Sequence, residues 1–252
     1  MTADPWARLE NATVVLAVHA HPDDESLATG ALLTALARRG TRVVLVTATR
    51  GEEGEVVPGS IAAGDSRPLD EIRADEIDAA CAHLGVAERH MLGTAPALAA
   101  DAADRIYRDS GMAWVREGLA GPSPSSGPDA FTRLPIEQAV ADLVALIEEV
   151  APQVVLGYDD AGSYGHPDHV HAHHVTAAAA EHTGVPFLQF ASDDEDPRFA
   201  WRELPGTAEM VEAALRCYRT QLTVVGRQED RVLVRHVGGQ DDVIRTRSGL
   251  RG

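Results

Sequence analysis

The chain has 252 residues, a formal net charge of −17, 44% apolar residues and only 4% aromatic ones. This length suffices for a sizeable buried core, and the apolar fraction excludes a disordered chain. The negative charge argues against nucleic acid and membrane surfaces as partners, because both need a basic surface on the protein. We therefore expect a folded protein whose partners are neither nucleic acids nor membrane surfaces.

The two cysteines, Cys81 and Cys217, lie in separate helix-like segments, so a disulfide framework is not expected. The N-terminus lacks a basic stretch followed by an apolar run, and no window of about 18 apolar residues exists. These features predict a cytoplasmic protein without a membrane span. The oligomeric state stays open between a monomer and a homo-oligomer.

The first half of the chain alternates strand-like and helix-like segments. The run TVVLAVHA, residues 13–20, is apolar on both faces, which is typical of an inner strand of a parallel sheet. Residues 25–40 have leucines at helical spacing and end at a glycine. They are followed by a strand at 42–51, a helix at 67–85 and a short strand at 89–93.

The second half resumes this alternation after an irregular region at 94–134, which holds the loop-forming cluster GPSPSSGPD at 121–129. The expected elements are then a helix at 135–152, a strand at 153–159, a helix at 167–184, a strand at 187–191 and a helix at 207–222. In residues 223–252 only RVLVRHV is expected to form a strand, at an edge.

This order predicts an α/β fold with a Rossmann-like, doubly wound, mostly parallel sheet and helices on both faces. We expect a single domain over 1–252, with a core at about 13–190. Residues 191–252 would form a C-terminal helix and an irregular or edge-strand extension. Ligands of such sheets bind at the carboxyl ends of the strands.

Two clusters of histidine and acidic residues follow strands at that edge. HPDDE covers residues 21–25, and SYGHPDHVHAHH covers residues 163–174. Zinc prefers imidazole and carboxylate ligands, and its catalytic sites use three protein ligands and a water. One His and one Asp from the first cluster, with one His from the second, would supply this set. The other carboxylate could then take a proton from the water.

Simpler interpretations of these residues stay open. Asp23 or Asp24 could only cap the following helix, and the histidines of the second cluster could pack or face solvent. His19 fits a core position or one behind the ligands, and Glu25 fits the first helical turn. The sequence has no GxSxG elbow, GxGxxG motif or Walker A loop, so its motifs favour chemistry with a metal-activated water.

The motifs AHPDDE and HPDH resemble those of the LmbE-like (PIG-L) zinc-dependent N-deacetylases. The similarity is strongest to the branch that deacetylates N-acetylglucosaminyl-inositol (GlcNAc-inositol) in mycothiol biosynthesis. It rests on TRGEEGE at 49–55, RADEIDAACAHLGV at 73–86, YRDSGM at 107–112 and YGHPDHVHAHH at 164–174. The resemblance covers residues 13–190 and implies a hydrolase that removes the acetyl group of a small N-acetylglucosaminide with a zinc-activated water. The same ligands tolerate Fe²⁺.

The resemblance implies that His21, Asp24 and His169 hold the metal. Asp23 would activate the water as a base and then protonate the leaving amine. A base beside the metal can stay ionised, because the cation favours the charged form. The two adjacent aspartates are thus expected to differ, with Asp24 facing the metal and Asp23 facing the water.

The resemblance also implies roles at the acetamide carbonyl. His166 would stabilise the tetrahedral oxyanion, with Asp168 tuning its orientation and charge. A neighbouring carboxylate favours a cationic imidazole, so His166 is expected to carry a proton. Tyr164 would help to polarise the carbonyl, although its position also fits simple packing.

Three residues are expected to contact the substrate: Arg73, Asp109 and Met112. Arg73 and Asp109 would bind sugar hydroxyls. From the residues alone, Arg73 could instead pair with Asp70 or Glu76 on its own helix, and Asp109 could be a plain turn residue.

Two other functions stay open. One is an amidase that cleaves a larger amide of the mycothiol S-conjugate type, although DSGM at 109–112 favours the deacetylase. The other is a non-catalytic metal- or sugar-binding protein on the same fold. The pair Asp23 and His166 argues against this last function, because a binding protein has no use for an unligated carboxylate beside the metal.

Overall fold

The computed structural model describes residues 4–116, 119–124 and 126–252. Its main sheet has seven strands, in the order β3-β2-β1-β6-β7-β12-β8. Their bounds in that order are Glu88–Met91, Arg42–Thr47, Val14–His19, Val154–Tyr158, Phe187–Phe190, Arg247–Arg251 and Ala200–Glu203. The five strands from β3 to β7 are parallel, and β12 runs antiparallel to β7 and β8. The expected α/β fold with a mostly parallel sheet is confirmed.

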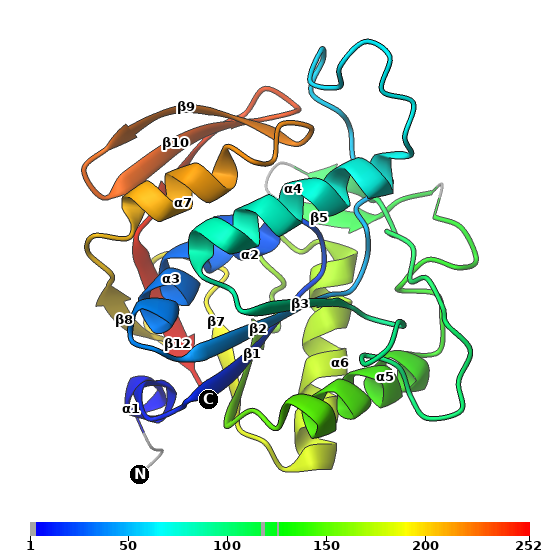
Figure 1. Ribbon diagram of the computed structural model, residues 1–252, viewed down its shortest axis with the longest axis vertical. Coiled ribbons are helices and arrows are strands. Elements are labelled where there is room, and N and C mark those ends of the chain that lie inside the picture. The colour runs from blue at the N-terminus through cyan, green and yellow to red at the C-terminus, as the bar shows by residue number, and fades with distance from the viewer. Residues whose placement is uncertain (1–3, 117–118, 125) are drawn as a thin grey trace.

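Helices cover both faces of this sheet, as the alternating pattern predicts (Figure 1). On one face α3 (Gly30–Arg38), α4 (Leu69–Leu84) and α7 (Ala208–Leu215) pack against one another. On the other face α5 (Ile136–Val150) packs against α6 (Pro167–Thr183). The short helices are α1 (Pro5–Glu10) and α2 (Asp24–Ala28). Within the described residues, no helix has the length and apolar character that crossing a membrane requires.

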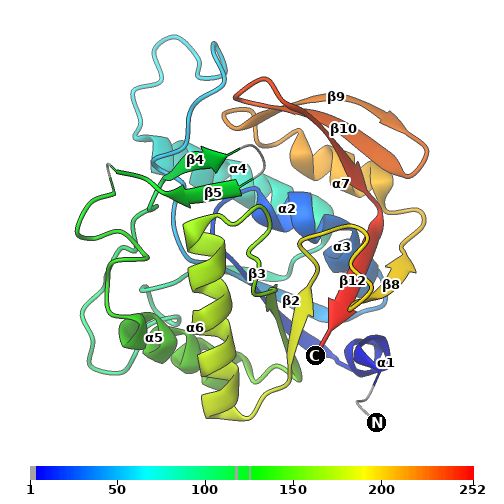
Figure 2. The ribbon, with the colours of Figure 1, turned by 180° about the vertical axis from the view of Figure 1, so that it is seen from behind.

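Two smaller antiparallel sheets lie at the upper end of the molecule in Figure 2. The first is the hairpin of β4 (Met112–Arg116) and β5 (Leu119–Pro122). The second has the order β11-β10-β9, with β9 at Leu222–Gln228, β10 at Arg231–His236 and β11 at Asp241–Arg245. Both project beyond the carboxyl ends of the parallel strands, where they can contribute to a site.

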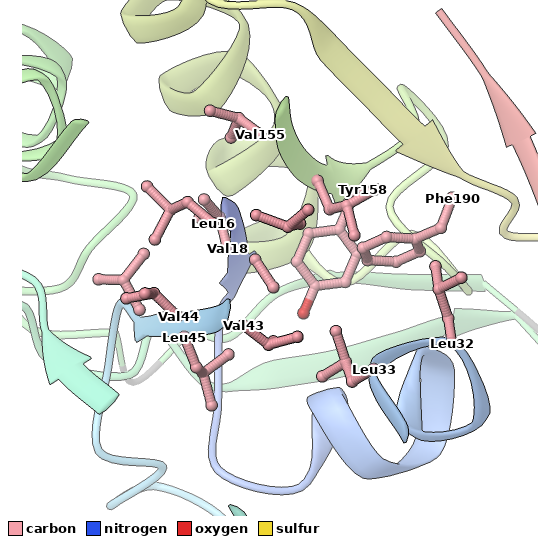
Figure 3. Packing of buried hydrophobic residues seen from close by; sticks show 14 of the residues in the cluster. Leu16, Val18, Leu32, Leu33, Val43, Val44, Leu45, Val155, Tyr158 and Phe190 are labelled. Atoms are coloured by element: carbon pink, nitrogen blue, oxygen red, sulfur yellow. The ribbon is translucent and has the colours of Figure 1, made fainter. Parts of the chain in front are cut away.

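The core consists of aliphatic residues of the central strands and of α3, with Tyr158 and Phe190 among them (Figure 3). The runs VVLAV in β1 and VVLV in β2 are almost entirely buried, because helices cover both faces of the sheet. Burial of each such side chain stabilises the fold by roughly 1.5–3 kcal/mol. The central strands are therefore a rigid support for residues attached to their ends.

The structure corrects several expected elements. The helix expected at 25–40 is divided into α2 and α3 at Thr29, whose hydroxyl donates to Glu25 O and contacts His19 Nε2. The region 94–134, expected to be irregular, contains the β4–β5 hairpin; residue 125 of its glycine- and proline-rich cluster lies outside the described residues. No pattern in the sequence predicts this hairpin, because two short strands that pair only with each other need no long alternation of apolar and polar residues.

The C-terminal region departs furthest from expectation. RVLVRHV was expected at an edge, but its residues form β10, the central strand of the three-stranded sheet. The last strand, β12, inserts between β7 and β8 of the main sheet. Neither β8 nor α1 has a pattern that predicts it. These pairings join segments far apart in the chain, so local periodicity does not reveal them.

The insertion of β12 predicts that the C-terminus contributes to stability. Leu250 is fully buried, so Leu250→Ala should lower the free energy of unfolding by about 2–5 kcal/mol. Val225 on β9 is 55% exposed, and Val225→Ala should change it by less than about 0.5 kcal/mol. Urea unfolding of both variants measures this, and equal effects would contradict the prediction.

Candidate metal and catalytic site

The candidate site lies where the strand order reverses. β1 pairs with β2 on one side and with β6 on the other. The connections that leave β1 and β6 diverge there, and such a point forms a crevice at the carboxyl ends of the strands. The HPDDE cluster follows β1, and the second histidine cluster follows β6, so the topology brings both to this crevice.

Three potential ligand residues converge in the crevice: His21, Asp24 and His169. His21 Nδ1 lies 3.2 Å from both His169 Nε2 and Asp24 Oδ2, Asp24 Oδ1 lies 3.2 Å from His169 Nε2, and all three residues are buried. Ligands about 2.0–2.1 Å from a tetrahedral zinc ion lie about 3.3 Å apart, so the observed spacing fits that ion. The donor set, two imidazoles and a carboxylate, also fits zinc.

Other donor sets overlap with this one at His21. The ligand atoms of His21, His166 and His169, and those of His21, Asp109 and Asp168, lie within 4.8 Å of one another. However, His166 Nδ1 accepts a hydrogen bond from Asp168 N–H at 3.1 Å. Asp168 Oδ2 likewise accepts from Ser110 N–H at 2.9 Å. Asp24 Oδ2 has hydrogen-bond partners too, but Asp24 Oδ1 faces His169 Nε2 at 3.2 Å, so we favour the set with Asp24 and His169.

Asp168 orients His21. Its Oδ2 lies 3.1 Å from His21 Nε2, and its side chain is fully buried. We assign the His21 proton to Nε2, where it donates to this carboxylate and leaves the Nδ1 lone pair free for a metal. Although burial opposes protonation, the nearby carboxylates of Asp109, Asp168 and Asp24 raise the pKa of His21 well above its ordinary value. Such a strongly basic imidazole is a good donor to a metal.

Asp24 is held by the turn after β1 and by the last residue of β6. Its Oδ2 accepts hydrogen bonds from His21 N–H at 2.8 Å and from the Tyr158 hydroxyl at 2.7 Å. Burial opposes ionisation, but His169 and His21 hold the pKa of Asp24 well below its ordinary value. The carboxylate is thus ionised and fixed in place, as metal binding requires.

Tyr158 is a site residue that sequence reasoning missed. Besides its bond to Asp24, its hydroxyl accepts from Ala20 N–H at 3.0 Å, and its ring stacks on His169 with 4.5 Å between ring centroids. It therefore orients two of the three potential ligands. The available signal was a polar aromatic residue at the end of an otherwise aliphatic strand, VVLGY.

Asp23 has a strained backbone. Its φ of 109° is uncommon for a residue other than glycine, and such strain is often found at functional sites. Asp23 stands at the N-cap position of α2, but its side chain makes no capping hydrogen bond, so the simple helix-cap interpretation is wrong. Its carboxyl group lines the pocket instead. Burial, with the adjacent Asp24 and Glu25 charges, raises the pKa of Asp23 well above its ordinary value.

Glu25 holds this strained turn from behind. It lies in the first turn of α2, as expected, but its carboxylate is fully buried. It accepts from the hydroxyls of Ser26 and Tyr218 at 2.5 Å each and from Asp23 N–H at 3.2 Å. In addition, Gln221 Nε2 donates to Pro22 O at 2.8 Å. The segment after α7 therefore fixes the turn that carries Asp23.

The surroundings of His166 favour a neutral ring. The Asp168 carboxylate, expected to tune it, faces His21 and Ser110, and only the Asp168 N–H contacts the His166 ring. Burial, together with His21 and His169, lowers the pKa of His166. A neutral ring that accepts at Nδ1 carries its proton on Nε2, where it can still donate a hydrogen bond.

The site opens into a pocket of about 630 Å³, lined by eight of the ten predicted site residues. The other two, Asp168 and His169, are buried behind its surface. Tyr164 is 42% exposed at the pocket, with its ring centroid 5.6 Å from those of His169 and Trp114. Met112 lies at the start of β4, also on the lining.

Arg73 lines the pocket, but its guanidinium binds the backbone of a loop and is therefore not a free site for a ligand. Its guanidinium donates to the carbonyls of Gly51, Gly54 and Glu55, and its side chain is buried. A Cβ at Gly51 or Gly54 would lie within 2.8 Å of Arg73 Nη1, so a larger residue at either position would displace the guanidinium. No ion pair joins Arg73 to Asp70 or Glu76 among the described residues.

Asp109 is both a turn residue and a pocket residue. Its Oδ1 accepts from Gly111 N–H at 2.8 Å and lies 3.6 Å from His21 Nε2. Burial opposes ionisation, but His21 lowers the pKa of Asp109. His19 is buried and contacts Thr29, as expected for a core position behind the ligands.

Comparison with known proteins identifies the family. Residues 16–180 match the profile of the PIG-L family, described as GlcNAc-PI de-N-acetylase. The chain belongs to the PIG-L family. The expected relationship to LmbE-like deacetylases is therefore confirmed.

Several curated relatives of this PIG-L chain have the name 1D-myo-inositol 2-acetamido-2-deoxy-alpha-D-glucopyranoside deacetylase. The protein of Thermobifida fusca is 43% identical over 177 residues, which are 69% of this chain and 56% of that protein. The protein of Acidothermus cellulolyticus is 44% identical over 172 residues, which are 67% and 53% of the two chains. The chain thus matches only about half the length of these relatives.

Solved structures share the fold at lower identity. The zinc-inhibited form of teicoplanin deacetylase Orf2 aligns with a TM-score of 0.57 and 22% identity. The alignment covers 82% of this chain and 84% of the Orf2 chain. The N,N'-diacetylchitobiose deacetylase from Pyrococcus horikoshii has a TM-score of 0.60 and 18% identity, covering 86% and 73%.

The position of Tyr158 predicts a role in metal binding. Tyr158→Phe removes the hydroxyl that holds Asp24, so zinc affinity should fall about 10–100-fold. Tyr107 is a matched control, since it is also buried and donates to a carboxylate, that of Asp142, at 2.7 Å outside the site. Competition with a metal indicator would measure both variants. Unchanged affinity in Tyr158→Phe, or an equal loss in Tyr107→Phe, would contradict this role.

Proposed function

We propose that the chain is a zinc-dependent N-deacetylase that removes the acetyl group from the N-acetylglucosamine unit of a GlcNAc-inositol-like glycoconjugate. The observation that carries the proposal is the convergence of His21 Nδ1, His169 Nε2 and the Asp24 carboxylate, at separations of 3.2 Å, beside the strained, pocket-lining Asp23. The names of the curated relatives support the substrate class. The free, separate cysteines Cys81 and Cys217 agree with a cytoplasmic location.

His21, Asp24 and His169 would hold the zinc ion. When bound, zinc polarises the acetamide carbonyl and lowers the pKa of a water to about 7. The ion fits this donor set in spacing and chemistry, and its charge offsets the buried carboxylates. Fe²⁺ would be accepted by the same ligands.

Asp23 would take a proton from the attacking water. In the absence of a cation, its pKa is raised by burial and by the neighbouring carboxylates. A nearby cation favours the ionised form, so the carboxylate would be a base at neutral pH and a competent acid after accepting the proton. It would then protonate the amine as the carbon–nitrogen bond breaks, and acetate and the free amine would leave.

His166 would stabilise the oxyanion formed from the carbonyl oxygen. Its Nδ1 accepts a hydrogen bond from Asp168 N–H, so the ring proton is on Nε2 and is available to the substrate. A neutral imidazole donor suffices for this task, because a preorganised hydrogen bond in a water-excluded site strongly stabilises developing charge. Tyr164, at the pocket surface, would donate to the same carbonyl oxygen.

The substrate residues would act in two ways. Asp109 would bind a sugar hydroxyl directly, and Met112 would contact the apolar face of the substrate. Because its guanidinium already holds the 51–55 loop, Arg73 would act mainly by shaping the pocket, with its remaining surface available to a hydroxyl.

A matched pair of variants tests the proposed base. Asp23→Asn should retain zinc but lower the rate of acetate release from GlcNAc-inositol about 10²–10⁴-fold, the usual contribution of a general base. The control Asp104→Asn alters an exposed aspartate outside the pocket and should retain full activity. Wild-type turnover by Asp23→Asn with zinc bound would exclude Asp23 as the base.

The substrate class is tested with the zinc-loaded wild-type protein. Acetate release from GlcNAc-inositol, abolished by a chelator and restored by zinc, is expected. If the protein instead cleaves only a mycothiol S-conjugate, the amidase alternative is correct. If it binds zinc and hydrolyses neither substrate, the deacetylase proposal is wrong.

A further inference from the structure

The turn between β10 and β11 forms one wall of the pocket, although it lies outside residues 16–180 matched by the family profile. It contributes His236, Val237, Gly238, Gln240, Asp241 and Asp242 to the lining. The base of the turn is anchored, because Val232 and Val234 of β10 are fully buried in the core. In Figure 2 the same sheet projects over α7 toward the pocket end of the molecule. This wall is therefore a fixed part of the pocket.

The lining is rich in carboxylates and poor in available cations. Seven lining residues are acidic: Asp23, Asp24, Glu53, Glu55, Asp109, Asp241 and Asp242. Among the described lining residues Arg73 is the only arginine, and its guanidinium donates to loop carbonyls. The chain contains no lysine. Proteins usually bind phosphate through Arg, Lys or free backbone N–H groups, so this pocket offers little to an anionic ligand.

The carboxylates of the wall differ in how far they are neutralised. Asp241 pairs with both Nε and Nη2 of Arg235, at 2.6 and 3.0 Å. Asp242 instead accepts from Val243 N–H at 2.6 Å and lies 3.4 Å from His236 Nε2, without an arginine partner. Among the described residues no arginine offsets the charge of Asp242, whereas Arg235 offsets that of Asp241. Asp242 is therefore the less compensated of the two carboxylates on this wall.

The rest of the pocket mouth suits an uncharged ring. Trp114, on β4, is 52% exposed, and Met112 and Val237 add further apolar surface to the lining. Apolar side chains can cover the C–H faces of a polyol, while the carboxylates accept hydrogen bonds from its hydroxyls. Neither type of group can compensate the charge of a phosphate.

We propose that the β10–β11 turn selects an uncharged polyol aglycone and rejects a phosphate-bearing one, with Asp242 as the main specificity-determining residue. This inference rests on the proposed deacetylase function. Two substrate classes are distinguished in this way. The description of the family profile names GlcNAc-PI, which carries a phosphate, whereas the names of the curated relatives specify an inositol glycoside without one. The acidic wall favours the uncharged glycoside as the substrate of this chain.

The test compares GlcNAc-inositol with the same glycoside carrying one phosphate monoester on its inositol ring. Binding of both to the zinc-loaded protein is measured by calorimetry, and kcat/KM is measured by acetate release. The wild-type protein should prefer the uncharged glycoside in both measurements. Asp242→Asn should reduce that preference about threefold to fivefold, and Asp242→Arg should reduce it about tenfold. High salt should weaken both effects.

Asp230→Asn is the matched control, because Asp230 lies at the opposite end of the same sheet and outside this pocket. It should leave the preference unchanged. Equal affinity of the wild-type protein for the two glycosides, or an unaltered preference in both Asp242 variants, would overturn the inference. If binding shows the preference but neither glycoside loses acetate, the proposed reaction fails and the specificity of the wall stands.

Discussion

The site depends on one constraint, the sharp turn from His21 to Asp24 at the end of β1. The turn must return the Asp24 carboxylate to the His21 N–H, which requires the strained φ of 109° at Asp23. Such strain persists only where surrounding contacts compensate for it. Here Glu25 accepts the Asp23 N–H, and Tyr218 and Gln221 hold the turn from behind. The adjacent aspartates consequently face different groups: Asp24 faces His169, and Asp23 faces the pocket.

The same constraint explains why the C-terminal third of the chain is integral to the site. α7 and the following residues brace the turn, β12 completes the main sheet, and the β10–β11 turn supplies a pocket wall. The part of the chain matched by the family profile supplies the proposed metal ligands and the proposed base. The segment beyond it supports these residues and shapes the entrance of the pocket. In the proposed function, reaction type and substrate choice therefore depend on different segments of the chain.

Much of the site was predictable because its residues follow strands directly. A parallel α/β order places the carboxyl ends of β1 and β6 at one edge, so HPDDE and GHPDH could be expected to meet. The structure brings together His21, Asp24 and His169 as the motifs suggested. The partner of Asp168 was not predictable, because both His21 and His166 contact Asp168. Only side-chain packing directs its carboxylate to His21, while the His166 ring contacts the Asp168 N–H.

The sequence by itself determined the α/β class, the parallel core, the two clusters and the family. These depend on local periodicity and on motifs whose spacing is short. The tertiary structure decided the contacts that join distant segments: Tyr158 on Asp24, Tyr218 on Glu25, β12 inside the sheet and the acidic wall beside the pocket. Local sequence carries no record of such pairings, because each half of a long-range contact has an ordinary pattern until the other half packs against it.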